Sequence, residues 1–270
     1  MEGTELGAVG SLTRREFVLA TLVAACGRAA RADQSGPRAA PPDRSKARLA
    51  SRPGQPSLEI GLGLTELKLT RGPRDALIYL PATYRREQPA AFALMLHGAG
   101  GSARDVVANS GPLSDATNTI ILGVDSRELT WDILGGGYGP DIAFIDQALD
   151  WAFARCAVDL TRLAIGGFSD GASYGLSVGL ANGDLFTHVL AFSPGFMVPP
   201  ALVGKPRIFI SHGTQDQVLT IDSTSRTLVP QLQRTGYQVR YREFDGPHTV
   251  PLDVAREALD WFTGPGMTDK

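Results

Sequence analysis

Three side chains at the ends of apolar runs have the types and the order needed for nucleophilic catalysis. Ser169 is the serine of residues 167–171, which fit G-x-S-x-G, the pattern of a nucleophile on a sharp strand-to-helix turn. The same pattern also fits around Ser173 and Ser177. Only Ser169 directly follows an apolar run, 163–168, and opens a helical stretch. We therefore predict that Ser169 is the nucleophile and that the other two serines pack within the helix.

A serine hydroxyl attacks only if an oriented base takes its proton. In this type of strand-turn-helix site the chain order is serine, acid, histidine. His248 follows the last apolar run and comes after the candidate acids, so it is the predicted base. Asp216, just beyond the run 208–210, is the predicted acid, because Asp222 belongs to the next helix and Asp245 is too close to the histidine. The other histidines, which precede these acids, are His97, His188 and His212.

Acyl transfer also needs N–H groups directed at the developing oxyanion. The N–H that follows the nucleophile is that of Asp170. The second is expected from the glycine-rich loop 97–101, where Ala99 is the first choice and Gly98 and Gly100 remain alternatives. A phosphate-binding loop is the competing interpretation, but no Lys-Ser/Thr pair follows and the spacing does not match a dinucleotide fingerprint.

Alternating short apolar runs and helical stretches must position these groups. Their order predicts one α/β domain over residues 58–270, a mostly parallel central sheet with helices on both faces and no large lid domain. Asp141 is placed to cap the first predicted helix. Strands are predicted at 58–70, 76–80, 92–96, 120–124, 163–168, 189–192, 208–210 and 239–244, and helices at 141–153, 221–234 and 254–262.

The first 57 residues have a different composition. Residues 1–32 read as an export signal: Arg14 and Arg15 precede an apolar run, 17–25, that is too short to span a bilayer and is similar to a twin-arginine signal. The run ends at Cys26 in a possible lipoprotein box, and residues 30–32 offer a competing cleavage site. We expect a bacterial protein exported to the periplasm, held at the membrane by a lipidated N-terminus, or secreted. Residues 33–57, rich in proline and arginine, are expected to be a disordered linker.

Composition excludes several classes of protein. Apolar residues make up 43% of the 270 residues and charged residues 20%, as in soluble globular proteins, and the net charge of -2 argues against a nucleic-acid binder. Two cysteines cannot build a disulfide scaffold or a four-thiolate zinc site, and no metal is expected. Cys156 is expected in the core.

Taken together, four stretches resemble the α/β-hydrolase superfamily. They are most similar to lidless bacterial esterases of the phospholipase/carboxylesterase type and to polyhydroxybutyrate depolymerase-like proteins. The resemblance covers about residues 75–265. The stretches are Leu96-His97-Gly98-Ala99-Gly100-Gly101, Gly167-Phe168-Ser169-Asp170-Gly171, His212-Gly213-Thr214-Gln215-Asp216 and Gly246-Pro247-His248.

The resemblance implies a serine carboxylic-ester hydrolase that needs no cofactor. Without a lid, the site is expected to suit short-chain or otherwise accessible esters, small or polymeric. Alternatives are a polyester or feruloyl-type depolymerase, a serine peptidase or amidase, and a catalytically inactive surface lipoprotein. The residues expected to line the substrate site are His97, Gly98, Trp131, Tyr138 and Phe196.

Overall fold

The computed structural model describes residues 47–108 and 110–264. The chain divides into two compact units, Met1–Pro41 and Pro42–Lys270, and every described residue belongs to the second. The predicted export signal, the lipidation site at Cys26 and the competing cleavage site lie outside the described residues. No helix in the described ranges is both long and apolar enough to cross a membrane.

Strands and helices alternate along the described chain. The strands are β1 (Gly63–Glu66), β2 (Ala76–Leu80), β3 (Ala90–Leu96), β4 (Thr119–Val124), β5 (Val158–Phe168), β6 (His188–Phe192), β7 (Arg207–Gly213) and β8 (Val239–Phe244). The helices are α1 (Ala103–Val107), α2 (Gly111–Thr117), α3 (Pro140–Phe153), α4 (Asp170–Ala181), α5 (Ser225–Arg234) and α6 (Leu252–Thr263), with a short 3-10 helix, η2, at Asp132–Gly135.

The eight strands form one sheet in the order β1-β2-β4-β3-β5-β6-β7-β8. Strand β2 runs antiparallel to both of its neighbours, and every pair from β4–β3 to β7–β8 is parallel. The prediction of a mostly parallel sheet is therefore confirmed. The carboxyl ends of the parallel strands share one edge, so the loops after β3, β5, β7 and β8 meet there.

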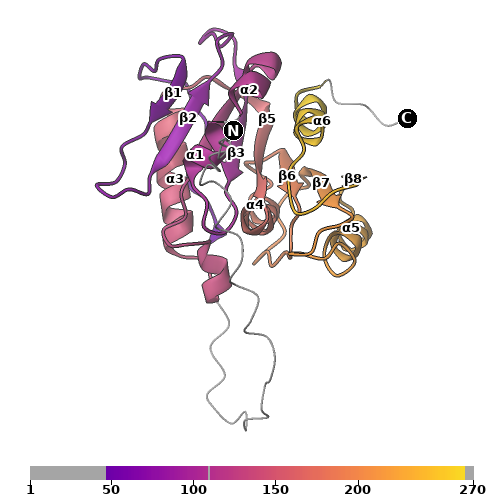
Figure 1. Ribbon diagram of the computed structural model, residues 1–270. Helices are drawn as coiled ribbons and strands as arrows, with labels where there is room; N and C mark the ends of the chain where they lie inside the picture. Colours follow the sequence, from indigo (N-terminus) through magenta and orange to yellow (C-terminus); the bar gives the residue numbers. More distant parts are fainter. Residues whose placement is uncertain (1–46, 109, 265–270) are drawn as a thin grey trace, which may run out of the picture. The chain divides into compact units, whose positions relative to one another are not determined.

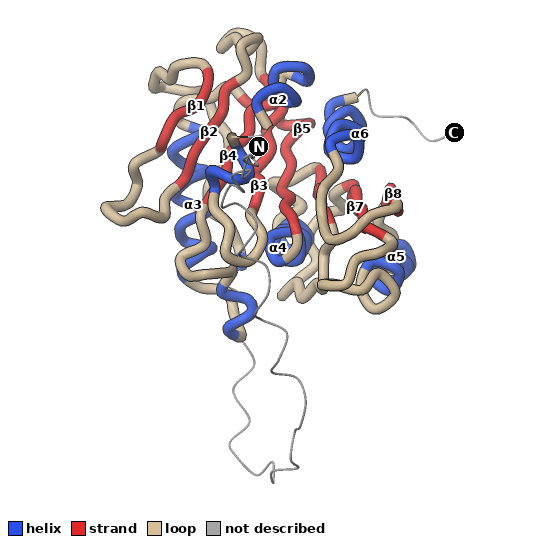
Figure 2. The backbone as a smooth tube through the Cα atoms, viewed as in Figure 1, coloured by secondary structure: helices blue, strands red, loops and turns tan. Residues whose placement is uncertain are grey.

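Helices cover both faces of the sheet, as predicted (Figures 1 and 2). Helices α3, α4 and α5 pack on one face around a core that includes Leu94, Ile120 and Ile165. Helices α1, α2 and α6 pack on the other face, around a second core that includes Ile121 and Leu190. Successive strand residues point to opposite faces, which is why neighbours such as Ile120 and Ile121 enter different cores.

The predicted disordered linker 33–57 is wrong for its described part, residues 47–57. Ala47 and Leu49 are buried, at 0% and 3% exposed. The Asn182 side chain accepts a hydrogen bond from Leu49 N at 2.9 Å and donates one to Ala47 O at 2.8 Å. The Arg48 guanidinium pairs with Asp184 at 2.7 Å. Polar groups of the folded domain therefore hold this segment in place. Its few apolar residues form no pattern from which packing could be predicted.

Two further local expectations need correction. Asp141 does not cap α3: the N-cap is Gly139, and the Asp141 carboxylate instead accepts Arg127 N and Asp132 N, at 2.6 and 2.7 Å. Helices α1 and α2 were not anticipated from the sequence. They are only five and seven residues long, too short for a helical period to stand out.

Candidate active site

Ser169 lies on a strained turn between β5 and α4. Its φ and ψ are 57° and -121°, a conformation that residues with a side chain rarely adopt. Glycines on either side permit the turn, because a Cβ on Gly167 would lie 2.4 Å from Leu96 O and one on Gly171 would lie 2.4 Å from both Leu96 O and His97 O. The strand-turn-helix setting predicted for Ser169 is therefore present, and the end of β3 lies directly against it.

A continuous hydrogen-bond chain joins the three residues singled out from the sequence. His248 Nε2 lies 2.8 Å from Ser169 Oγ, and His248 Nδ1 lies 2.5 Å from Asp216 Oδ2. The carboxylate can only accept, so Nδ1 carries a proton and Nε2 of the neutral ring is free to accept the serine proton. The loops after β5, β7 and β8 bring these side chains together across 79 residues of sequence.

Asp216 is held in its ionised form by donors on both carboxylate oxygens. Its Oδ1 accepts Val218 N at 2.9 Å and Leu219 N at 2.8 Å. Burial by itself would raise the pKa of Asp216, but the hydrogen bonds from Leu219 N, His248 and Val218 N outweigh it and bring the pKa below its usual value. The acid is therefore ionised at neutral pH and oriented by the backbone.

His212 is a second histidine on this carboxylate, and no role was predicted for it from the sequence. Its Nε2 lies 2.7 Å from Leu219 O and 3.1 Å from Asp216 Oδ2, and its Nδ1 lies 2.7 Å from Ser225 Oγ. Because Leu219 O can only accept, Nε2 carries the proton. Burial lowers the pKa of His212, so the fully buried ring is neutral. Its position in a His-Gly pair four residues before the acid was the available signal.

The glycine-rich loop after β3 is anchored by His97. The ring is 2% exposed, with Nδ1 2.7 Å from Gly98 O and Nε2 accepting Ser126 N at 3.0 Å. Trp131 Nε1 donates to His97 O at 2.9 Å. Burial lowers the pKa of His97, which favours the neutral ring that these contacts require. Both ring nitrogens are engaged in holding the loop, and His97 also belongs to the lining of the cavity described below, so its predicted contact with substrate stays a prediction.

The anchored loop lies beside Ser169. A Cβ built on Gly98 would be 3.4 Å from Ser169 Cβ, so this part of the backbone borders the nucleophile. Asp170 begins α4, where N–H groups have no partner within the helix, and its side chain accepts Thr130 Oγ1 at 2.7 Å. Ala99 is exposed at the tip of the loop. The geometry is compatible with Asp170 and Ala99 as the oxyanion donors, which stay a prediction.

Two aromatic residues expected at the substrate site are buried structural residues. Trp131 is 1% exposed and stacks on Tyr174 with ring centroids 5.0 Å apart. Tyr138 is 7% exposed and donates its hydroxyl to Val198 O at 2.9 Å. Rings packed this deeply do not line an accessible pocket, so the substrate-binding prediction is wrong for both. Phe196 is half-buried, and its role stays a prediction.

Ser173 and Ser177, the other two pattern matches, are fully buried in α4. Ser173 Oγ accepts Gly195 N at 2.8 Å, and Ser177 Oγ accepts Val198 N at 3.0 Å. Both hydroxyls therefore tie the helix to the loop after β6.

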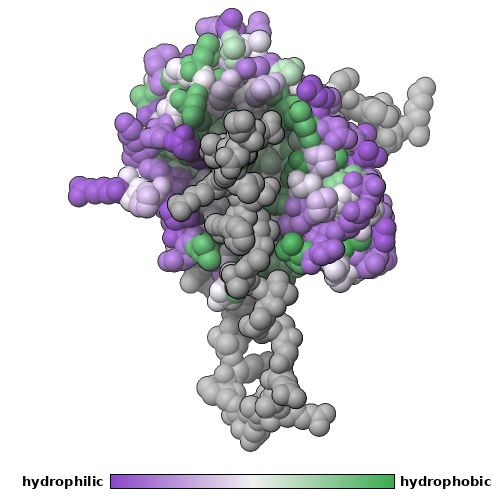
Figure 3. Space-filling view, viewed as in Figure 1, coloured by the Kyte–Doolittle hydropathy of each residue, from purple (hydrophilic) through white to green (hydrophobic). Residues whose placement is uncertain are grey.

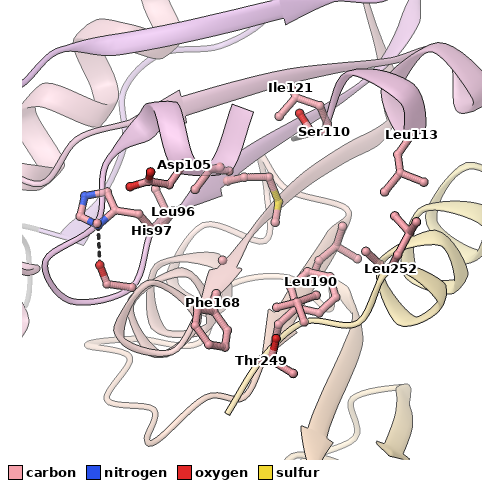
Figure 4. Close-up of a pocket in the computed structure, with 18 of the residues that line it drawn as sticks. Leu96, His97, Asp105, Ser110, Leu113, Ile121, Phe168, Leu190, Thr249 and Leu252 are labelled. Atoms are coloured by element: carbon pink, nitrogen blue, oxygen red, sulfur yellow. Dashed lines mark hydrogen bonds between the residues drawn. The ribbon is translucent and has the colours of Figure 1, made fainter. Parts of the chain in front are cut away.

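A cavity of about 560 Å³ opens beside the histidine. Its lining includes Gly98 and Ala99 of the anchored loop and His248. It also includes Phe168, the residue before the nucleophile, which Figure 4 labels. The Phe168 ring also packs against the His248 ring, with centroids 4.6 Å apart and the two planes tilted by 36°. Within residues 47–108 and 110–264, no three His, Cys, Asp or Glu side chains group as ligands for a metal ion.

Comparisons with known proteins identify the fold. No family model matches the chain, and no curated protein matches it in sequence. Three solved structures that it resembles are an S-formylglutathione hydrolase from Staphylococcus aureus, a carboxylesterase from Bacillus cereus and a ferulic acid esterase from Anaeromyces mucronatus.

The three solved structures share little sequence with this chain, but each match covers nearly all of the solved structure. The TM-scores are 0.59, 0.53 and 0.56, at identities of 14%, 17% and 17%. The matches cover 77%, 71% and 79% of this chain and 100%, 94% and 93% of the respective structures. The chain therefore has the α/β-hydrolase fold shared by these esterases and hydrolases.

Proposed function

We propose that the protein is a serine carboxylic-ester hydrolase in which Ser169, His248 and Asp216 form a catalytic triad. One observation carries the proposal: the unbroken hydrogen-bond chain from a buried carboxylate through a histidine to a serine on a strained turn. The α/β-hydrolase fold, shared with solved carboxylesterases, supports ester hydrolysis in general. Accessible esters are the proposed substrates.

The proposed reaction has two steps with the same groups acting in reverse. Ser169 Oγ attacks the ester carbonyl carbon while its proton passes to His248 Nε2, and Asp216 stabilises the imidazolium. The N–H groups of Asp170 and Ala99 hold the oxyanion of the tetrahedral intermediate. The carbon–oxygen bond to the alcohol breaks as the alcohol takes the proton from His248. Water then attacks the acyl-serine, gives its proton to His248, and the acid leaves as Ser169 recovers a proton.

Turnover of a nitrophenyl acetate and covalent labelling by a fluorophosphonate test the proposal together. Wild-type protein should do both, and Ser169→Ala should do neither. Ser177→Ala is the matched control, because this serine fits the same sequence pattern but lies two turns into α4 with its hydroxyl on Val198 N. Undiminished turnover in Ser169→Ala would refute the assignment. Failure of the wild-type protein to label would favour an inactive hydrolase body.

The proposal that the enzyme is exported rests on residues 1–32 alone. It predicts loss of extracytoplasmic protein when Arg14 and Arg15 are both replaced by lysine, measured by cell fractionation.

A further inference from the structure

The cavity beside His248 exists because one face of the sheet is incompletely covered. Helix α1 has only five residues, and α2 packs against β4 and α6, so the sheet surface between these helices is left open. Figure 4 shows α1 and α2 on one side of the cavity, the start of α6 on the other, and strands beneath. The opening is a consequence of two short helices where longer ones would fill the space.

The lining of the cavity is largely apolar. Met95 of β3, Ile121 of β4 and Leu190 of β6 form its floor, Val106 and Leu113 form one wall, and Ala255 lies on the opposite wall. In Figure 3, hydrophobic residues (green) are visible in the hollowed part of this face that the grey atoms leave uncovered, and hydrophilic residues (purple) surround it. Binding of an apolar group to such a lining is favourable, because it removes apolar surface from water.

The cavity also reaches the proposed reaction centre. Gly98, Ala99 and His248 belong to its lining, and a Cβ on Gly98 would touch Ser169 Cβ at 3.4 Å. A substrate group in the cavity therefore lies next to His248 and to the loop that borders Ser169. The volume of about 560 Å³ lies within the range of pockets that enclose a small organic ligand.

We propose that this cavity binds the acyl chain of the ester, and that the enzyme prefers medium-length acyl chains to acetate. This inference rests on the proposed ester hydrolysis. The cavity is closed beneath by the sheet, so it suits the group that stays on Ser169 after the first step. The alcohol must depart before water enters, and the solvent side is its exit. The preference replaces the short-chain expectation drawn from the lack of a lid.

Two ester series test the inference. In the first, the nitrophenyl alcohol is constant and the acyl group runs from acetate to octanoate; in the second, acetate is constant and the alcohol is lengthened. Burial of one methylene lowers the barrier enough to raise kcat/KM about fourfold. We expect a rise of about fourfold per methylene over the first few members of the acyl series and a flat alcohol series.

Filling the cavity should remove this dependence. Ala255→Trp places a large ring on the α6 wall, and Arg256→Trp places the same ring on the adjacent exposed position outside the cavity. The ratio of octanoate to acetate kcat/KM is independent of the active fraction, so it isolates the pocket from any loss of folded protein. The ratio should fall at least tenfold in Ala255→Trp and keep the wild-type value in Arg256→Trp. Val106→Trp fills the cavity from the opposite wall if Ala255→Trp does not fold.

Different results contradict the acyl pocket and the ester hydrolysis on which it rests. A flat or falling acyl series, a rise confined to the alcohol series, or an unchanged ratio in both filled variants overturns the acyl pocket and leaves ester hydrolysis standing. Absence of both acetate turnover and fluorophosphonate labelling in the wild-type protein overturns the proposed function, and the acyl pocket with it.

Discussion

Replacing Asp216 by asparagine tests whether the carboxylate sets the protonation of His248. In the wild-type protein Oδ1 accepts the N–H groups of Val218 and Leu219, at 2.9 and 2.8 Å. An asparagine must place its carbonyl oxygen there, because an amide NH₂ would face two donors. Its NH₂ group is then directed at His248 Nδ1, the position where Oδ2 lies 2.5 Å away.

This orientation inverts the histidine tautomer. Nδ1 must accept from the amide, so the proton moves to Nε2, which faces Ser169 Oγ at 2.8 Å and can no longer take the serine proton. The His212 Nε2–H, 3.1 Å from the same carboxylate oxygen, adds a further unfavourable contact with the NH₂ group. Loss of the correct tautomer costs about 10³- to 10⁴-fold in kcat, equivalent to about 4–5 kcal/mol of barrier.

The assay is steady-state hydrolysis of a nitrophenyl acetate at pH 7.5, with unfolding by urea as the measure of integrity. We expect Asp216→Asn to lower kcat by this factor with KM changed less than threefold, because binding groups are untouched. Asp222→Asn is the matched control: this exposed carboxylate pairs with Arg226 at 2.8 Å and is expected to leave kcat unchanged. A folded Asp216→Asn protein that retains more than a tenth of wild-type kcat would refute the reasoning.

Three other predictions concern the framework of the site. Burial and the nearby Arg207 charge lower the pKa of His188 to about 4, whereas the histidine of an unfolded chain takes up a proton near pH 6.5. The free energy of unfolding should therefore fall by about 2 kcal/mol between pH 7.5 and pH 5. His188→Leu should lack this contribution to the pH dependence, as measured by urea unfolding at the two pH values. Gly171→Ala forces a Cβ to within 2.4 Å of two carbonyl oxygens. It should lower the free energy of unfolding in urea by ~2–3 kcal/mol and remove most of kcat. Gly135→Ala, with open space around the added Cβ, should change neither the stability nor kcat. Burial raises the pKa of Cys156 to about 12, so its thiol should resist iodoacetamide at pH 8 in the folded protein and react in urea, as measured by peptide mass spectrometry.

Each of these has a result that would contradict it. An unaltered pH dependence in His188→Leu would mean that the buried ring is protonated in the folded state. Wild-type stability in Gly171→Ala would mean that the turn after Ser169 can widen. Rapid labelling of Cys156 at pH 8 without denaturant would mean that the core around it opens readily.

The local patterns that predicted strands succeeded where an apolar run is short and buried on both faces. The runs that became β3 to β7 are of this kind, and their alternation with helices was enough to predict a mostly parallel sheet. The extended strand expected over 58–70 was the exception. Only Gly63–Glu66 pairs with β2, because an edge strand is held by one neighbour and its sequence carries a weak pattern.

The choice of Ser169 over Ser173 and Ser177 needed only local sequence, because a strand must precede and a helix must follow such a turn. The order of Ser169, Asp216 and His248 along the chain likewise follows from which strand each one ends. What the chain order cannot supply is distance. The 2.8 Å and 2.5 Å contacts arise because parallel strands end at one edge of the sheet.

Only the tertiary structure decided the surroundings of these residues. Trp131 and Tyr138 lie in glycine-rich loop sequence, yet both rings pack in the core, and residues 47–57 are held by Asn182 and Asp184 far along the chain. His212 contacts the acid because it lies at the end of β7, and the loop that follows β7 brings Asp216 back against it. The cavity depends on how short α1 and α2 are and on where α6 lies against them. Burial and cavities are sums over contacts from distant segments, whereas a strand, a turn and their order are properties of neighbouring residues.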